Sequence, residues 1–338
     1  MKHSSVYDII IVGGGHAGVE AAHIATKLGC SIALITMDRA AIGRMSCNPA
    51  IGGLAKGQIV REIDVLGGLM PSAADIAGIQ FKTLNKSKGR SVWSPRAQVD
   101  KRAYEAFVSL SILNNLKIDV ITGECVSVSA PGGKVAGVSL RSGDFIKSSA
   151  IVLTCGTFMS GLIHVGERKI LAGRMGEEGA DGITESLQSL GFSTGRLKTG
   201  TPPRIQAASI DWGASQPAVG DTDPIPFSYK TQSFHPPNEP CYIVHTNKKV
   251  HSVISKNLHR SPMYSGEILG TGPRYCPSVE DKINRYQHHE SHTLFLEPEW
   301  KNSDQIYING FSTSLPEEVQ HKSLKRLQGF EKIEFLRP

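Results

Sequence analysis

Two of the six cysteines stand where the chain could make a sulfur atom reactive. Cys47 comes directly before an Asn-Pro pair and Cys276 before a Pro-Ser pair, and proline favours the first position of a helix. A thiol just before a helix N-terminus ionises easily, and Arg44 and Arg274 lie shortly upstream with a charge that favours a thiolate. Both cysteines are candidates for a nucleophile or an acid–base group. The alternative is a small buried residue at a helix start, the usual place of a free cysteine.

The remaining thiols and a group of histidines predict no further chemistry. Three cysteines lie at or beside apolar strands and are expected in the core: Cys30, Cys125 and Cys155. Cys241 stays undecided. Three neighbouring histidines have neither the zinc-protease spacing nor a second group of ligands: His288, His289 and His292. We expect these histidines on a surface helix, and we expect no metal site.

A glycine pattern near the N-terminus indicates a dinucleotide site. The apolar run 6–12 is long enough for one buried parallel strand, and Gly13, Gly15 and Gly18 follow with the spacing G-x-G-x-x-G. Residues 17–28 predict a helix and residues 31–36 a second strand. The glycines allow a tight turn, a close approach of pyrophosphate and close helix packing, while the helix N-terminus attracts the anion. A chance glycine-rich turn would lack this strand–helix–strand context.

The acidic residue that usually binds a ribose hydroxyl is displaced. The second strand ends at Thr36, and Asp38 is the first carboxylate after it. Either Asp38 binds the ribose from this position, or the ribose is held in another way.

Further elements position these residues. Residues 48–68 predict a helix with Asn48 as its N-cap and Pro49 as its first residue. Residues 116–128 and 134–140 predict a strand pair with its turn at 131–133, and residues 150–156 predict a buried strand that ends at Gly156. Ser278 and Asp281 have the spacing of a capping box at the start of a helix.

Segment 81–102 is rich in positive charge, which fits a solvated surface and an anion-contacting face equally well. Its basic residues surround Trp93: Lys82, Lys86, Lys88, Arg90, Arg96, Lys101 and Arg102.

Composition changes after residue 200. Residues 201–240 hold eight prolines and few apolar runs, which predicts irregular structure or the entrance to an inserted domain. Short strand and helix signals resume at 242–269 and 306–331, and the chain stops at Pro338 without a terminal element, as if cut.

The whole composition is that of a two-domain globular protein. Its 338 residues are 40% hydrophobic, and the net charge of +6 permits a polyanionic partner without requiring one. The sequence contains neither a signal peptide nor an apolar run long enough for a bilayer, and its cysteines form no CxxC pair. We therefore expect a reduced, cytoplasmic protein without a membrane partner.

These motifs resemble one family, the FAD-dependent tRNA-modifying enzymes known as GidA or MnmG. The resemblance rests on residues 13–18, 45–53 and 272–283, and it is supported by 196–204 and 295–299. It extends over essentially the whole chain, with Tyr286 where the family typically has Phe. The resemblance implies an α/β fold in which a Rossmann-like FAD-binding domain of the two-dinucleotide-binding type contains an inserted α/β domain. The implied domains are 1–200 for FAD, 201–300 for the insertion and 301–338 for a truncated return to the FAD domain, with the C-terminal helical part of the family fold absent.

The resemblance also implies a reaction. Family members install an aminomethyl or carboxymethylaminomethyl group on carbon 5 of the wobble uridine in certain tRNAs. They use FAD reduced by NADH, methylenetetrahydrofolate as carbon donor, and the GTPase MnmE as partner in a heterotetramer, and they are homodimers. The alternatives are a folate- and FAD-dependent tRNA uridine methyltransferase similar to TrmFO, against which the 272–282 signature argues, and a non-catalytic FAD-binding fragment.

Site residues follow by matching positions. Cys47 and Cys276 match the two cysteines tied to chemistry, where a thiolate that adds to the pyrimidine ring would make its carbon 5 nucleophilic. The residues expected at FAD are Gly13, Gly14, Gly15, His16, Ala17, Gly18, Asp38, Gly156 and Cys125 or its neighbour Val126. The residues expected at NAD are Gly272, Pro273, Arg274, Tyr275, Pro277, Ser278, Glu280, Asp281, Lys282 and Arg285. The residues expected at tRNA are Arg96, Arg102, Arg196, Lys198 and Arg204. The chain departs from the family at Ile170-Leu171-Ala172, where a polar run is usual.

Overall fold

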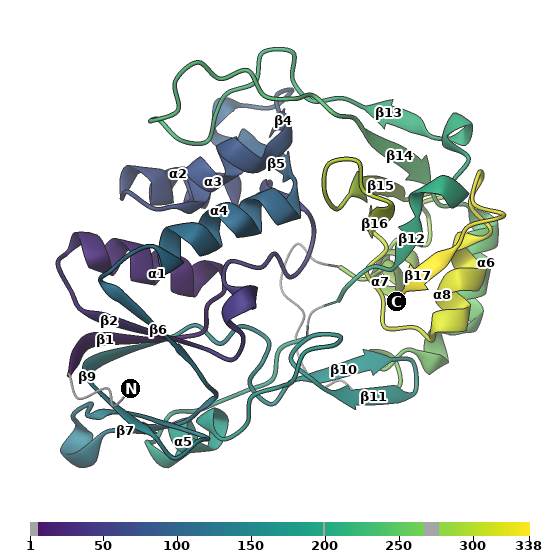
Figure 1. The fold of residues 1–338 in the computed structure, drawn as a ribbon. Coiled ribbons are helices and arrows are strands. Elements are labelled where there is room, and N and C mark those ends of the chain that lie inside the picture. The colour runs from purple at the N-terminus through teal and green to yellow at the C-terminus, as the bar shows by residue number, and fades with distance from the viewer. Residues whose placement is uncertain (1–5, 199, 267–276) are drawn as a thin grey trace.

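A six-stranded sheet with the order β6-β2-β1-β9-β8-β7 organises the first half of the structure, a computed structural model that describes residues 6–198, 200–266 and 277–338 (Figure 1). Four strands run parallel: β6 (Ile118–Thr122), β2 (Ile32–Thr36), β1 (Tyr7–Val12) and β9 (Phe145–Leu153). The hairpin of β7 (Cys125–Ser129) and β8 (Gly137–Leu140) extends the sheet antiparallel to β9. The strand expected over 116–128 is thus two strands, of which only the second pairs with the 134–140 region.

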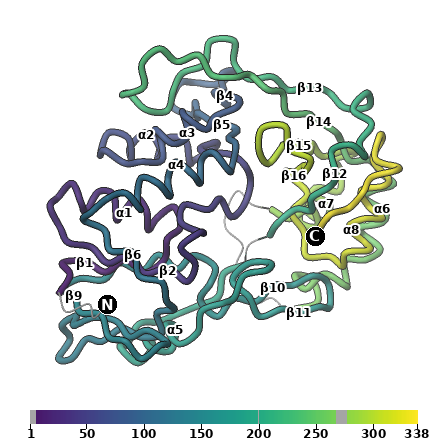
Figure 2. Tube along the Cα trace, viewed as in Figure 1, coloured from purple at the N-terminus to yellow at the C-terminus, as the bar shows by residue number. Residues whose placement is uncertain are grey.

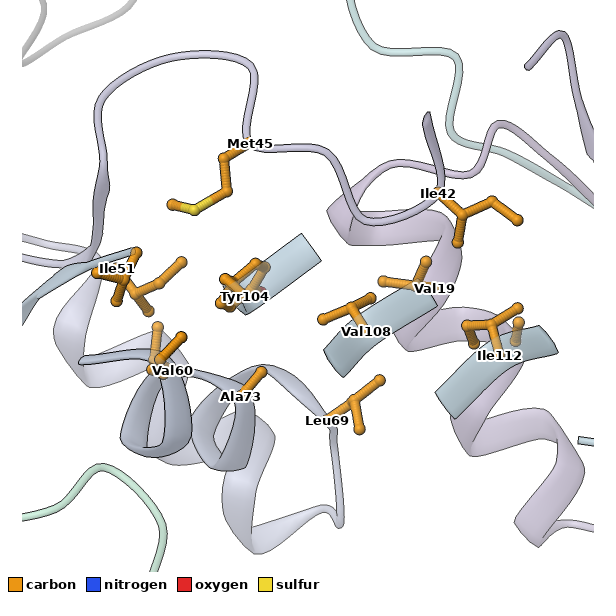
Figure 3. Close-up of a cluster of buried hydrophobic side chains, with 14 of the residues drawn as sticks. Val19, Ile42, Met45, Ile51, Val60, Leu69, Ala73, Tyr104, Val108 and Ile112 are labelled. Atoms are coloured by element: carbon orange, nitrogen blue, oxygen red, sulfur yellow. The ribbon is translucent and has the colours of Figure 1, made fainter. Parts of the chain in front are cut away.

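Both faces of this sheet are covered, because its central strands are apolar on both sides. On one face α1 (His16–Lys27) packs against β1 and β2, and α4 (Lys101–Leu113) packs against α1 and β6. Their contact buries Val19, Tyr104 and Val108 (Figure 3). On the other face the β7–β8 hairpin and α5 (Ile183–Ser189) cover Ile10 and Ile35. The predicted strand, helix and strand at the N-terminus are confirmed.

A three-stranded antiparallel sheet lies beside α4 and corrects one sequence expectation. Its order is β3 (Ala50–Gly52), β5 (Ser94–Val99) and β4 (Gly78–Leu84). The helix expected from Pro49 is wrong, because α2 begins only at Gly57 and runs to Val65, followed by α3 (Met70–Ala77). Gly52 and Gly53 have φ of +79° and +88°, which a right-handed helix does not contain, and residues 50–52 pair with β5 instead.

The second large sheet is antiparallel throughout, with the order β13-β14-β15-β16-β12-β17. Its strands are β12 (Arg204–Gln206), β13 (Gln216–Ala218), β14 (Cys241–His245), β15 (Thr293–Pro298), β16 (Gln305–Asn309) and β17 (Phe335–Arg337). The helices α6 (Lys248–Lys256), α7 (Val279–Arg285) and α8 (Glu317–Leu324) cover one face over a core of Leu294, Ile308 and Phe311. Residues 301–338 contribute β16, α8 and β17 to this second unit, while the domain boundaries themselves stay predictions.

Shorter segments connect the sheets. The proline-rich stretch between β13 and β14 is irregular, as expected, and crosses to the edge of β4 (Figure 2). There the Asp221 N–H donates to the Phe81 carbonyl at 2.8 Å and the Glu239 N–H to the Ile79 carbonyl at 2.9 Å. A separate hairpin joins β10 (Leu162–Val165) and β11 (Arg168–Leu171). Short 3-10 helices lie at Arg39–Ala41, Arg90–Val92, Pro131–Gly133, Ala207–Ser209, Trp212–Ala214 and Leu258–Arg260.

Two further expectations concern the surface. His288 lies in the turn after α7, and His289 and His292 lie outside any helix, so the expectation of a surface helix is wrong. In the described ranges no helix is both long and apolar enough to cross a bilayer.

Candidate functional site

The glycine-rich loop after β1 has the backbone geometry that a dinucleotide requires. Gly13 has φ of +108°, and a β-carbon there would collide with the carbonyl of Thr154 on the neighbouring chain segment. A β-carbon on Gly18 would strike the Gly13 carbonyl, so this glycine lets α1 approach the loop closely. Gly15 differs, because a β-carbon would meet no heavy atom within 4 Å. The loop is therefore packed tightly against protein atoms at Gly13 and Gly18. It is open at Gly15, at the N-terminus of α1, where backbone N–H groups attract an anion.

His16, at the start of α1, supplies a polar atom without a protein partner. Its Nδ1 is buried and makes no hydrogen bond within the described part of the chain. Burial lowers the pKa of His16, and the charge of Arg174 lowers it further, so the ring is neutral at neutral pH. The ring lies edge-on to Tyr104, with centroids 5.6 Å apart. An open glycine cradle with an unpaired nitrogen beside it fits a phosphate-bearing ligand such as FAD.

The other residues expected at FAD lie in varied surroundings. Gly156, just after β9, has φ of +60° and open space where a β-carbon would be. The Asp38 carboxylate accepts a hydrogen bond from the Ala40 N–H at 2.8 Å and lies 3.6 Å from Arg44. Ala17 is exposed on the first turn of α1, and Gly14 is buried in the loop. The role of each at a cofactor stays a prediction.

The pair Cys125 and Val126 lies at the start of β7, where the pairing with β8 is irregular. Cys125 is buried, and burial raises the pKa of its thiol to about 12, so the sulfur stays neutral. Val126 lies at an irregularity where the pairing of β7 with β8 shifts between Cys125 and Ser127. A bulged residue leaves the regular ladder, and its peptide groups can then bind a ligand.

The loop that carries Cys47 is attached to the glycine-rich loop. The Gly43 N–H donates to the Gly14 carbonyl at 2.9 Å, and the Met45 N–H donates to the Glu105 carboxylate at 2.7 Å. Cys47 is exposed and does not precede a helix, so the mechanism of activation expected for it is wrong. Its Sγ lies 3.3 Å from the hydroxyl of Tyr307 on β16.

A cluster of buried charges lies directly behind Cys47. The Lys101 ammonium is 3.0 Å from Glu299 and donates to the Cys47 carbonyl at 2.7 Å. Arg204 is 3.1 Å and Arg337 is 3.3 Å from the same carboxylate. Burial lowers the pKa of Lys101, although Glu299 opposes the shift. Burial alone would raise the pKa of Glu299, but the charges of Lys101 and Arg204 outweigh it and hold that pKa below its usual value. Three basic side chains thus meet at one ionised carboxylate, which leaves a net positive charge next to Cys47.

The five residues expected at tRNA lie in different surroundings. Arg96 lies 2.6 Å from the buried Glu297, and Arg204 is itself buried against Glu299, so both guanidinium groups are engaged inside the protein. Arg102 is exposed and stacks over Trp300 at 3.7 Å from the ring centroid. The other two lie on the segment after α5. Arg196 is exposed and donates to the Ser160 carbonyl, and Lys198 is half-buried against Met263.

The segment expected at NAD is described only in part. Cys276 lies outside the described residues, together with Gly272, Pro273, Arg274 and Tyr275. The predicted cap is confirmed, because the Ser278 hydroxyl accepts from the Asp281 N–H at 3.1 Å. Pro277 therefore precedes the N-cap and is not the first residue of α7. An open cavity of about 300 Å³ is lined by Pro277, Lys282, Tyr286, His289, His292 and Thr293.

Three α7 residues have further contacts. Glu280 is fully buried and accepts hydrogen bonds from Ser261, Thr313 and the Ser314 N–H, while its Oε2 has no partner within the described residues. Lys282 donates to the Gly310 carbonyl at 2.9 Å. Arg285 lies 3.7 Å from Asp281 on the exposed side of the helix.

Sequence reasoning missed Tyr307, Glu299 and the burial of Lys101. The stretch 295–299 carried the only signal, since it holds two carboxylates within an apolar strand pattern. Buried carboxylates require cationic partners, and the basic segment 81–102 offers them. Across the described ranges, no group of three or more His, Cys, Asp or Glu side chains is arranged to hold a metal ion.

Comparison with known proteins identifies the family. Residues 8–338 match the model of the family described as Glucose inhibited division protein A. The chain is 49% identical to the tRNA uridine 5-carboxymethylaminomethyl modification enzyme MnmG of Chlorobaculum tepidum, over 98% of this chain and 54% of that protein. It is equally 49% identical to the MnmG of Cytophaga hutchinsonii, with the same shares. The chain spans about half the length of the curated relatives it matches.

A solved structure gives the same result for the fold. GidA of Aquifex aeolicus superposes with a TM-score of 0.93 at 43% identity, over 99% of this chain and 57% of that one. The expected Rossmann-like α/β fold with a second α/β unit is therefore confirmed. Because the family match covers nearly every residue, the chain belongs to the glucose inhibited division protein A, or GidA, family.

Proposed function

We propose that the protein takes part in FAD-dependent modification of carbon 5 of the wobble uridine in tRNA, adding an aminomethyl or carboxymethylaminomethyl group. The observation that carries this proposal is the attachment of the Cys47 loop to the glycine-rich loop through Gly43 and Gly14. We therefore place the exposed thiol of Cys47 and the N-terminus of α1 in one site. The name of the MnmG relatives supports the choice of tRNA uridine as substrate.

The residues of the chain divide the work. The open backbone at Gly15 and the first turn of α1 hold the pyrophosphate, and His16 offers a neutral ring nitrogen to the ligand. FAD, when bound, supplies reversible hydride transfer with NADH as reductant. The exposed Cys47 and the family's second cysteine, Cys276, act on the uracil ring as nucleophile and proton donor. Methylenetetrahydrofolate is the carbon donor, and MnmE and a second copy of the chain are the protein partners.

The test combines flavin content with product analysis. Purified protein is incubated with tRNA, MnmE, NADH, methylenetetrahydrofolate and either ammonium or glycine, and the nucleosides are then analysed. We expect bound FAD and a uridine modified at carbon 5. Cys47→Ser and Cys276→Ser should each stop modification and leave FAD bound and reducible by NADH, since serine keeps the shape but supplies no thiolate.

Other results would redirect the proposal. Formation of 5-methyluridine would support the folate-dependent methyltransferase instead. A protein that binds FAD and forms no modified nucleoside would be a binding fragment, and a protein that cannot be loaded with FAD would contradict the proposal altogether. Unchanged modification in either serine variant would make that cysteine structural.

A further inference from the structure

The contact between Cys47 and Tyr307 joins the two large units of the fold. Cys47 lies in the loop before β3, and Tyr307 lies on β16 of the second sheet, 260 residues later in the chain. The tyrosine is only 4% exposed, whereas the cysteine is exposed. The hydroxyl therefore reaches the sulfur from the protein side and leaves its outer side open to a reactant.

Charged groups surround the tyrosine ring. The Arg204 guanidinium carbon is 4.7 Å and the Lys101 ammonium is 5.9 Å from the ring centroid. Glu299 accepts hydrogen bonds from both cations, and Lys101 also donates to the carbonyl of Cys47. Lys101 thus fixes the backbone of the cysteine and also lies over the ring whose hydroxyl meets its sulfur.

The direction of the hydrogen bond follows from burial. Burial raises the pKa of Tyr307, Cys47 and Glu297 raise it further, and only Arg204 opposes the shift. The hydroxyl therefore stays protonated over the range in which cysteine thiols ionise. Once the sulfur is a thiolate it has no proton to give, so the hydroxyl is the donor. A hydrogen bond to the charged form favours that form.

We propose that Tyr307 is a positioning residue that orients and stabilises the Cys47 thiolate through its hydroxyl, with Lys101 holding the cysteine backbone. This inference rests on the proposed function, in which Cys47 reacts. The opposing view is that the buried hydroxyl of Tyr307 only satisfies its own need for a partner. The two views differ in what removal of the hydroxyl does to the reactivity of the sulfur.

Alkylation of the full chain with iodoacetamide measures that reactivity directly. The thiolate displaces iodide, a sulfur–carbon bond forms, and iodide leaves with the electron pair. Trypsin then releases residues 45–56, a peptide in which Cys47 is the single cysteine. Peptide 28–39 contains Cys30 alone and serves as the internal reference thiol. Rates are measured across the pH range in which thiols ionise.

Tyr307→Phe keeps the ring and removes the hydroxyl. We expect alkylation of Cys47 at neutral pH to slow by about three- to tenfold, as for the loss of one hydrogen bond, and its pH profile to move upward. Cys30 should not change. Tyr242→Phe, on β14 of the same sheet, is the matched control and should leave both profiles as in the unaltered protein. A Cys47 profile in Tyr307→Phe that superposes on that of the unaltered protein would overturn the inference.

Replacement of Tyr307 by 3-fluorotyrosine gives a result even if the phenylalanine variant fails to fold. Fluorine makes the hydroxyl a stronger donor and keeps its place, so the Cys47 profile should move to lower pH. An unmoved profile would contradict the role of the hydroxyl. Neither measurement needs FAD or tRNA, so failure of the proposed function would appear in the nucleoside assay and not here.

Discussion

At Gly15 a β-carbon would meet open space, whereas at Gly13 it would collide with the Thr154 carbonyl. The two glycines thus serve different purposes, although they belong to one motif. Gly13 is needed by the protein itself, because its φ of +108° and its close neighbour leave no room for a side chain. A glycine at position 15 is needed only so that a ligand can approach the backbone closely.

Gly15→Val should therefore remove flavin binding without unfolding the protein. A β-carbon at this position meets no heavy atom within 4 Å, and the valine methyl groups extend from it into the space beside the start of α1. Flavin absorbance of the purified protein and its thermal midpoint are the two measurements. The control is Gly89→Val, where the backbone is also extended, a β-carbon would meet only the Ser91 hydroxyl at 4.0 Å, and the residue is far along the chain from the cofactor loop. Normal flavin content in Gly15→Val would show that the glycine-rich loop does not bind the flavin.

Gly13→Ala should lower both flavin content and stability. A left-handed backbone and a collision with a carbonyl together cost about 1–3 kcal/mol of the free energy of unfolding. Chemical denaturation of Gly13→Ala beside Gly15→Val separates the two roles. Equal free energies of unfolding in the two variants would contradict the division.

At the scale of elements, β5 and the start of α4 join the second sheet through buried charges. Arg96 pairs with Glu297, the Gln98 side chain donates to the Pro298 carbonyl, and Lys101 pairs with Glu299. Two residues of β5 and the first residue of α4 thus meet three successive residues, 297–299, at the end of β15. The positive charge of segment 81–102 therefore serves the junction of the two units at these positions.

Arg96→Ala should destabilise the protein strongly. It leaves Glu297 buried without its cation, which costs about 3–5 kcal/mol of the free energy of unfolding. Arg102→Ala is the matched control, because its exposed guanidinium loses only a contact with Trp300 worth about 0.5–1 kcal/mol. The free energies of unfolding are measured by urea denaturation. An equal decrease in Arg96→Ala and Arg102→Ala would show that Glu297 finds another partner when Arg96 is removed.

Arg102 and Arg196 are better candidates for tRNA than Arg96 or Arg204, because they are exposed. If they contact phosphates, Arg102→Ala and Arg196→Ala should each reduce the slope of log affinity against log salt by about 1. Binding is measured at several salt concentrations with a fluorescent tRNA. Unchanged slopes would show that both arginines are solvated surface residues that do not contact the tRNA phosphates.

Local patterns predicted the first strand, helix and strand because their glycines and apolar runs act over a few residues. The helix at Pro49 was wrong because residues 50–52 pair with β5, more than forty positions away, and distant pairing overrides local preference. The partners of Cys47 could not be predicted for the same reason. Tyr307 carries no local signal, and only the folded arrangement of two sheets brings its hydroxyl to the sulfur.

At the scale of the whole molecule, Glu299 makes the free energy of unfolding depend on pH in the acid range. Its pKa in the folded protein lies below the ordinary value, so folding favours the ionised form. This contribution is fully present above the unfolded pKa of about 4.3 and is lost as pH falls through the folded pKa. The three cations that meet at this carboxylate then lose their common partner.

Glu299→Gln should therefore lower stability most at neutral pH and progressively less in acid. The gap in free energy of unfolding between this variant and the unaltered protein should narrow below the unfolded pKa of about 4.3 and close as pH falls through the lowered folded pKa of Glu299. Glu290→Gln is the control, because its pair with Lys248 is fully solvated and contributes little at any pH. Denaturant titrations at a series of pH values supply the free energies. A gap that stays constant into acid would rule out this linkage.

The distance in sequence between Cys47 and Tyr307 also has a consequence for how the protein matures. The first sheet has all its strands once Leu153 has been synthesised, long before the tyrosine is made. Contacts that close so large a loop form late in folding. Cys47 is thus present early as an ordinary thiol. Its hydrogen bond with the Tyr307 hydroxyl forms only when the two units dock. Pulse alkylation during refolding would therefore detect docking of the two units as a change in the alkylation rate of the Cys47 sulfur.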